Sequence, residues 1–248
     1  MITETQIEAK PGGTMQWQRV ADLFVAPTRV FTDILRNRSW WLPFVLTILC
    51  SYTLTFSAAY KIGFRQLAMN ILRSDPASAA NYEEMSPAEK ETVIGTTETA
   101  FKISAFSTPA LIILFNVVWA LVLWIGLNLG ARGRAEFATV FAVLLYADLI
   151  QNIRALLATL MVYLTIDPTT FNITNPVGTN IGYYIDPESA GWFRTVLEST
   201  DVITFWYLTL IALGCAIVAK VSRRASFSVV FGIWLLIAVT RIVWVAIA

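Results

Sequence analysis

A small set of polar side chains within long apolar runs could carry most of the chemistry of this 248-residue chain. Polar groups at membrane depth are costly and usually face the interior of a helix bundle, so they are the default functional candidates. A helical rise of about 1.5 Å per residue places five of them at similar depths, about 15–21 Å from the expected cytoplasmic ends of their helices. This candidate polar cluster consists of Asn116, Asp148, Gln151, Asn152 and Arg241.

The cluster has two interpretations. A polar cavity or ion path would make it the site of a small transporter or channel, whereas an interhelical hydrogen-bond cluster would only fix the packing; we favour the second. Asp148 shares a helix face with Gln151 and Asn152 because they lie three and four residues away, and we expect it to pair with Arg241 on another helix. Arg154 lies six residues from Asp148, on a different face, so we expect it to snorkel outward.

These side chains belong to five apolar stretches, each long enough to cross a hydrocarbon core, which requires about 20 residues. The sequence is 56% apolar and 14% charged, whereas soluble domains are about 45–50% apolar and about 25% charged. We therefore expect an all-α fold, a polytopic transmembrane helix bundle. A disordered tail is expected over residues 1–13 and a single membrane domain over 14–248, with spans at 41–60, 103–129, 138–166, 202–221 and 227–248.

The second and third spans are longer than a membrane core requires. At about 40 Å against about 30 Å, they must tilt, kink or project, and a break near Gln151 in the third span stays an alternative. Ser86, Pro87 and Glu89 form a capping box, which predicts a short surface helix from Pro87 in the preceding loop. Asn172 begins an N-glycosylation sequon, whose use depends on the source of the protein.

Residues 16–38 show apolar positions at helical spacing, interrupted at Pro27. Because proline is tolerated in the first helical turn but not in the interior, we expect two short helices that meet there. The second is amphipathic, so it lies in the cytoplasmic membrane interface or packs on the bundle. In the first case Arg29, Arg36 and Arg38 would contact lipid phosphates.

Lysine and arginine near the spans predict the orientation in the membrane. The segment before the first span, residues 1–40, carries five of them, and the loop between the third and fourth spans carries only Arg194. We therefore expect a cytoplasmic N-terminus and an external C-terminus. Gly126 and Gly130 form a GxxxG pair in the second span, which predicts a helix-packing seam, more often within one chain than between two.

Composition also excludes several classes of function. The chain has no histidine, which removes the Ser-His-Asp and Cys-His triads and the two-histidine metal sites. A net charge of +1 gives no electrostatic footprint for nucleic acid, and neither a P-loop nor a GxGxxG motif is present. We predict no enzymatic activity, no metal, no cofactor and no nucleic-acid partner.

The order of several motifs resembles that in bacterial members of the Yip1-domain family. They are LFVAPTRVF at 23–31, WWLPF at 40–44, NVVWALVLWIGLNLGARG at 116–133 and DVITFWYLTLIALG at 201–214. The resemblance implies a five-span protein of the bacterial cytoplasmic (inner) membrane without known catalysis, sometimes accompanying ABC-type exporters. The segment DLFVAP at 22–27 is one residue longer than the Asp-Leu-Tyr-Gly-Pro motif of eukaryotic relatives and lacks its glycine. Prenylated Rab-type GTPases are therefore not expected as partners.

Together these observations predict a non-enzymatic multi-pass membrane protein that organises or accompanies other membrane components. Its expected partners are membrane lipids and a second membrane protein, with an ABC-type exporter as one candidate. The alternative is a small transporter or channel that uses the candidate polar cluster.

Overall fold

The computed structural model describes residues 15–247 apart from 75, 166, 187–188 and 190. The expected tail, the last residue of the third span and Ala248 therefore lie outside the described residues. The regular structure of the described part is helical, ten α-helices with short η segments, and the expected all-α fold is confirmed. The elements are α1 (Gln16–Val25), α2 (Pro27–Ile34), α3 (Trp41–Lys61), α4 (Phe64–Ser74), α5 (Pro76–Glu84), α6 (Pro87–Ile125), η1 (Gly126–Gly130), α7 (Phe137–Leu164), η2 (Pro168–Thr170), η3 (Ile181–Tyr184), α8 (Gly191–Glu198), α9 (Val202–Ala219) and α10 (Arg223–Ile247).

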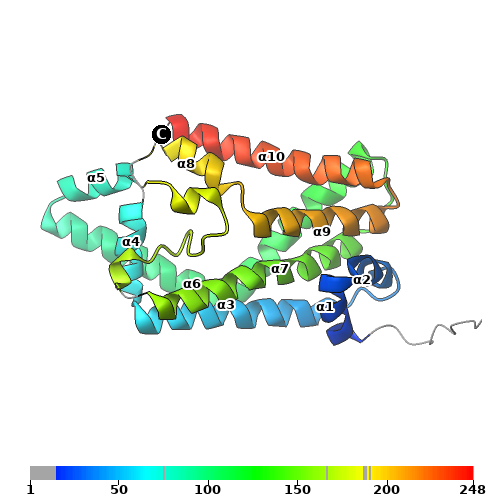
Figure 1. Cartoon of the computed structure of the whole chain (residues 1–248), viewed down its shortest axis with the longest axis horizontal. Helices are drawn as coiled ribbons and strands as arrows, with labels where there is room; N and C mark the ends of the chain where they lie inside the picture. The colour runs from blue at the N-terminus through cyan, green and yellow to red at the C-terminus, as the bar shows by residue number, and fades with distance from the viewer. Residues whose placement is uncertain (1–14, 75, 166, 187–188, 190, 248) are drawn as a thin grey trace, which may run out of the picture.

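Five of these helices are long and apolar enough to cross a membrane, and they coincide with the five expected spans. They are α3, α6 with η1, α7, α9 and α10. They run side by side along the long axis of the molecule (Figure 1). The alternative of a break near Gln151 is wrong, because α7 continues without interruption through that residue.

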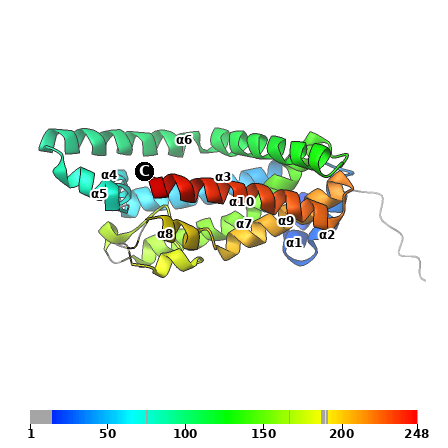
Figure 2. The same ribbon diagram turned by 90° about the horizontal axis from the view of Figure 1, so that it is seen from above.

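Helix α6 extends far beyond the expected second span. The capping box at Ser86 is confirmed, since its hydroxyl accepts from the Glu89 amide and the Glu89 carboxylate accepts from the Ser86 amide. The short, separate surface helix is wrong: the helix continues from Pro87 into the span, past Pro109. No cluster of turn residues ends it before the apolar run begins, so the helix propagates once it has started. Figure 2 shows α6 as the longest helix, one end projecting with α4 and α5.

Helix α7 forms the centre of the bundle. Every residue from Thr139 to Ala147 is buried, so the helix is covered on all sides over that stretch. Helices α3, α6 and α9 pack directly against it, and α9 separates it from α10. A helix that is buried all round fixes the positions of the others.

The two short N-terminal helices meet at Ala26–Pro27, as expected. Val30, Phe31 and Ile34 of α2 are completely buried, and the helix packs against α9 and α7. Of the two alternatives for its apolar face, the structure therefore shows packing on the bundle. The opposite end of the bundle holds α8 and the irregular segment before it, which fill the space between α7 and α10 (Figure 1).

Candidate functional site

The centre of the candidate polar cluster is Asp148 on α7. The Asn116 side-chain amide, from α6, donates to the Asp148 carboxylate at 2.8 Å and to the Ile112 carbonyl oxygen at 3.0 Å. Tyr207 on α9 also contacts Asp148. The carboxylate is thus held between three helices, and amide and phenol donors reduce the cost of placing it among apolar side chains.

A cavity of about 330 Å³ lies beside this carboxylate, between α3, α6 and α7. Its polar lining includes Thr47, Thr108, Asn116, Asp148 and Gln151. Within the described part of the chain, the Gln151 side chain has no hydrogen-bond partner, so it remains available at the cavity wall. Such a lining of hydroxyl, amide and carboxylate groups can hold a small polar group or a cation.

Asn152 lies on the same helix but makes a different contact. Its side-chain amide donates to the Thr47 hydroxyl of α3 at 3.2 Å, and both residues are buried. The structure thus brings four of the five proposed cluster residues into one layer. Two residues that sequence reasoning missed, Thr47 and Tyr207, join them; neither stands out, since threonine and tyrosine are common in membrane helices.

Arg241 does not join the layer, and the expected Asp148–Arg241 ion pair is wrong. The Arg241 guanidinium is exposed and faces the Glu198 carboxylate on α8 at 3.4 Å. The position of Arg241 along the sequence indicates its depth but says nothing about the direction of its side chain. Helix α9 stands between α10 and α7, so the two groups are kept apart.

The expectation that Arg154 snorkels outward is also wrong. Its guanidinium donates to the Asp201 carboxylate at 2.5 Å and to the Thr204 hydroxyl at 3.0 Å. Asp201 also accepts from the Thr179 hydroxyl and caps α9 through the Thr204 amide. Its position directly before an apolar helix is typical of an N-cap and could have identified it from sequence.

The Asp201 carboxyl has an altered acidity. Burial alone would raise its pKa, but the hydrogen bonds from Thr179 and the Thr204 amide, together with the charge of Arg154, hold the pKa below its usual range. The ionised form is therefore favoured. The network of Arg154, Thr179, Asp201 and Thr204 holds together α7, α9 and the segment before α8. It is called the clamp below.

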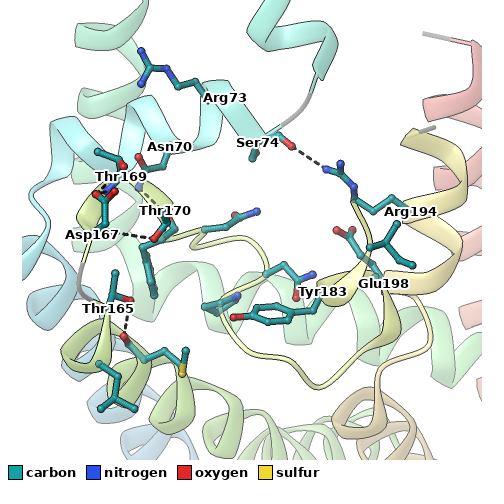
Figure 3. Close-up of a pocket in the computed structure, with 18 residues that line it drawn as sticks. Asn70, Arg73, Ser74, Thr165, Asp167, Thr169, Thr170, Tyr183, Arg194 and Glu198 are labelled. Atoms are coloured by element: carbon teal, nitrogen blue, oxygen red, sulfur yellow. Dashed lines mark hydrogen bonds between the residues drawn. The ribbon is translucent and has the colours of Figure 1, made fainter. Parts of the chain in front are cut away.

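A second and larger cavity, of about 730 Å³, lies at the α8 end of the bundle. Figure 3 shows its wall built from α4, the end of α7, the irregular segment after it and α8. Asn70 of α4 fixes this wall by donating to the carbonyl oxygens of Pro168 and Phe171, both at 2.8 Å. Sequence reasoning missed the cavity because its residues come from separate segments without a common spacing.

The expected lipid contacts lie at the α1 end of the molecule. Arg29 and Arg36 are exposed, and Arg38, also exposed, pairs with Glu136 at 2.6 Å. Their contact with lipid stays a prediction.

The two glycines of the GxxxG pair differ in their surroundings. A Cβ added at Gly126 would lie 2.8 Å from Val229 of α10, whereas nothing lies within 4 Å of one at Gly130. Gly126 thus permits close packing within the chain. Asn172, the sequon residue, accepts hydrogen bonds from the Thr174 amide and hydroxyl, and its glycosylation remains open.

Cysteine and acidic side chains are the groups of this histidine-free chain that could hold a metal ion. Among the described residues, no group of three or more of these side chains is placed to hold one. Cys50 and Cys215 are free thiols.

The sequence was compared with models of known protein families, and one of them matches. A family model described as the Yip1 domain matches residues 21–245, which include all five candidate spans except the last two residues of α10. The chain belongs to the Yip1 family. Yip1-family proteins are generally non-enzymatic membrane proteins, and this chain is an integral membrane protein with five candidate spans. Searches of curated proteins and of solved structures gave no match.

Proposed function

We propose that this Yip1-family chain is a non-enzymatic component of the bacterial inner membrane that organises or accompanies other membrane proteins. The observation that supports this most directly is the position of α10. This span packs on α9 and α8, and many of its large apolar side chains are exposed. They include Leu235, Leu236, Val239, Val243 and Trp244. Figure 2 shows α10 along one side of the bundle.

Such a surface suits a second transmembrane helix, because helices associate in lipid through van der Waals packing and interhelical hydrogen bonds. The centre of the bundle supports a scaffold role as well, since Asp148, Asn152 and Arg154 are all engaged by other helices of the same chain. The sequence resemblance makes an ABC-type exporter the first partner to look for.

Site-specific photocrosslinking in native membranes tests this proposal. A photoreactive residue at Leu236, which is 67% exposed, should give discrete protein adducts. The same residue at Ala238, which is 9% exposed and lies two positions away on α10, is the matched control and should give none. If Leu236 reacted with lipid alone while the protein was present at its natural level, the proposal would fail.

The proposed orientation has a cytoplasmic N-terminus and an external C-terminus, and it rests on the distribution of lysine and arginine. The structure places α1 and the end of α10 at opposite ends of the bundle, which suits an odd number of spans (Figure 1). A reporter enzyme that is active only outside the cytoplasm should be active when fused after Ile247, and a reporter that is active only in the cytoplasm should be inactive there. In this orientation Arg29, Arg36 and Arg38 would contact anionic lipid at the cytoplasmic surface.

A small transporter or channel is the second candidate, and the cavity beside Asp148 favours it. The full chain reconstituted in liposomes would then carry protons or small cations, and Asp148→Asn would abolish the flux. Asp22→Asn, outside the spans, serves as the control. Flux equal to that of protein-free liposomes would remove this candidate and leave the organising role untouched.

A further inference from the structure

The large cavity at the α8 end is not used by the function proposed above, and its depth in the membrane can be estimated. Glu198 of its wall faces Arg241 of α10, and a Cβ added at Gly191 would contact Val245. Arg241 follows Arg223, the first residue of α10, by 18 positions, or about 27 Å of helix, close to the thickness of a hydrocarbon core of about 30 Å. The cavity thus lies where lipid headgroups begin, on the side opposite to α1 and α2.

The cavity carries charges of both signs on one helix face. Arg194 and Glu198 stand four residues apart on α8, which places them side by side. Arg194 reaches across to the Ser74 carbonyl oxygen at 3.0 Å (Figure 3). Glu198 forms an ion pair with Arg241, which does not line the cavity and is 61% exposed.

Unused hydrogen-bond donors accompany these charges. The Tyr183 hydroxyl and the Arg73 guanidinium both belong to the lining, and neither has a hydrogen-bond partner in the described part of the chain. Figure 3 shows Tyr183 lying across the cavity, between Glu198 on one side and Thr170 on the other. Donors of this kind suit the oxygens of a phosphate.

The lining also contains apolar side chains. Met161, Leu164 and Ile185 belong to it, and Leu164 is 62% exposed. A ligand with a charged head and an acyl chain would match both parts. The volume of about 730 Å³ falls within the range of about 300–1,000 Å³ that small-molecule sites occupy.

We propose that this cavity binds the headgroup of a zwitterionic phospholipid with a primary amine, of the phosphoethanolamine class. The phosphate lies against Arg194 and the Tyr183 hydroxyl, with Arg73 at the rim, and the ammonium lies against Glu198. A two-carbon spacer separates phosphate from ammonium, which suits two side chains on consecutive turns of α8. Quaternary ammonium groups are recognised by aromatic cages. Among the described residues, the lining has two aromatic side chains, Phe171 and Tyr183, so choline lipids fit less well.

Native mass spectrometry of the full chain in detergent, titrated with lipids of identical acyl chains, tests the proposal. Phosphatidylethanolamine should bind more tightly than phosphatidylcholine or phosphatidylglycerol. Equal binding of the three lipids would overturn the proposal. The same headgroup chemistry could come from a phospholipid or from free phosphoethanolamine, and a competition experiment distinguishes the two. If soluble phosphoethanolamine displaced the lipid at equal concentration, the assignment to a lipid would be overturned.

The ammonium site has a matched pair of variants. Glu198→Gln should reduce the preference for ethanolamine over choline about tenfold, as expected for the loss of one charged hydrogen bond. Arg241→Gln breaks the same ion pair without changing the cavity lining, so it should keep the preference. If both variants lost it equally, the effect would belong to the ion pair and the proposal would fail.

The phosphate site has a second pair. Tyr183→Phe should weaken binding of all three lipids about fivefold, whereas Tyr184→Phe should not, because that hydroxyl donates to the Gly178 carbonyl oxygen at 3.1 Å. Thermal unfolding of each variant checks that the fold is kept. Unchanged binding by a folded Tyr183→Phe would overturn the placement of the phosphate. These readouts need no protein partner, so their outcome is independent of crosslinking at α10.

Discussion

The two ends of the helix bundle differ in how their space is filled. At the α1 end, Phe31 is fully buried and packs closely against Gly214 of α9, so α2 extends the core. At the α8 end, a polar cavity of about 730 Å³ lies among segments with little regular structure. The comparison suggests a division of roles, in which the first end stabilises the bundle and the second is free to bind.

Both ends use an arginine–aspartate ion pair, in different surroundings. Arg19 of α1 donates to the Asp33 carboxylate at 2.6 Å and to the Asn37 carbonyl oxygen at 2.8 Å, and its side chain is 1% exposed. The Arg154 side chain, paired with Asp201, is 33% exposed. Removing one partner of a pair costs more in the drier site, because the remaining charge has less access to water.

The largest expected effect is therefore at the α1 end. Arg19→Ala should lower the free energy of unfolding by about 3–5 kcal/mol, since it leaves the Asp33 carboxylate without its partner in a mostly buried site. Thermal or SDS-induced unfolding of the purified full chain in detergent measures this. Arg29→Ala, an exposed position on α2, should change the free energy by less than about 0.5 kcal/mol. Equal effects of the two variants would contradict the contrast between the ends.

Close packing at this end predicts the next effect. A Cβ added at Gly214 would lie 2.6 Å from Val143 and 2.9 Å from Phe31, so Gly214→Ala should cost about 1–3 kcal/mol through overpacking. Gly232→Ala in α10 is the matched control, because nothing lies within 4 Å of the added atom. It should leave stability unchanged or raise it by up to about 1 kcal/mol. The same unfolding assay would contradict the prediction if both substitutions behaved alike.

The clamp at the other end predicts a dependence on pH. The pKa of Asp201 lies below its ordinary value of 3.8. Its contribution to stability is therefore complete above that value and is lost as the pH falls through the lowered pKa. Asp201→Asn should cost about 1 kcal/mol at neutral pH, because it removes the carboxylate charge that pairs with the partly exposed Arg154 guanidinium, whereas an asparagine can still cap α9. It should also flatten this part of the acid unfolding curve. Asp22→Asn should leave the curve unchanged, and a curve that Asp201→Asn also left unchanged would contradict the assignment.

The elements were predictable from sequence to the extent that local chemistry fixes them. Apolar runs of about 20 residues gave all five spans, and Pro27 gave the boundary between α1 and α2. The capping box at Ser86 gave the start of α6 but not its length, because a cap marks where a helix begins and carries no information about its end.

The contacts between helices were harder to predict. Helical rise indicates how far along their helices Asp148 and Arg241 lie, but their partners depend on the rotation of each helix and on which helices are neighbours. The buried face of Arg19 was missed for the same reason, since arginine in an amphipathic helix usually marks the exposed side. The cavity at the α8 end is built by segments without periodicity, which sequence patterns do not bring together.

The smallest expected effect lies in the layer between the two ends. Thr47→Val removes the hydroxyl that accepts from Asn152 at 3.2 Å, and should cost about 0.6 kcal/mol, the average for interhelical hydrogen bonds in membranes. Thr53→Val is the control on the same helix, because the Thr53 hydroxyl bonds only to the Leu49 carbonyl oxygen of its own helix. Its change in unfolding free energy should be the smaller of the two. A loss of more than about 2 kcal/mol of unfolding free energy at Thr47 would exceed the contribution of any single bond of this kind. It would mean that the polar layer around Asp148 contributes to stability as the packed α1 end does, which contradicts the contrast drawn above.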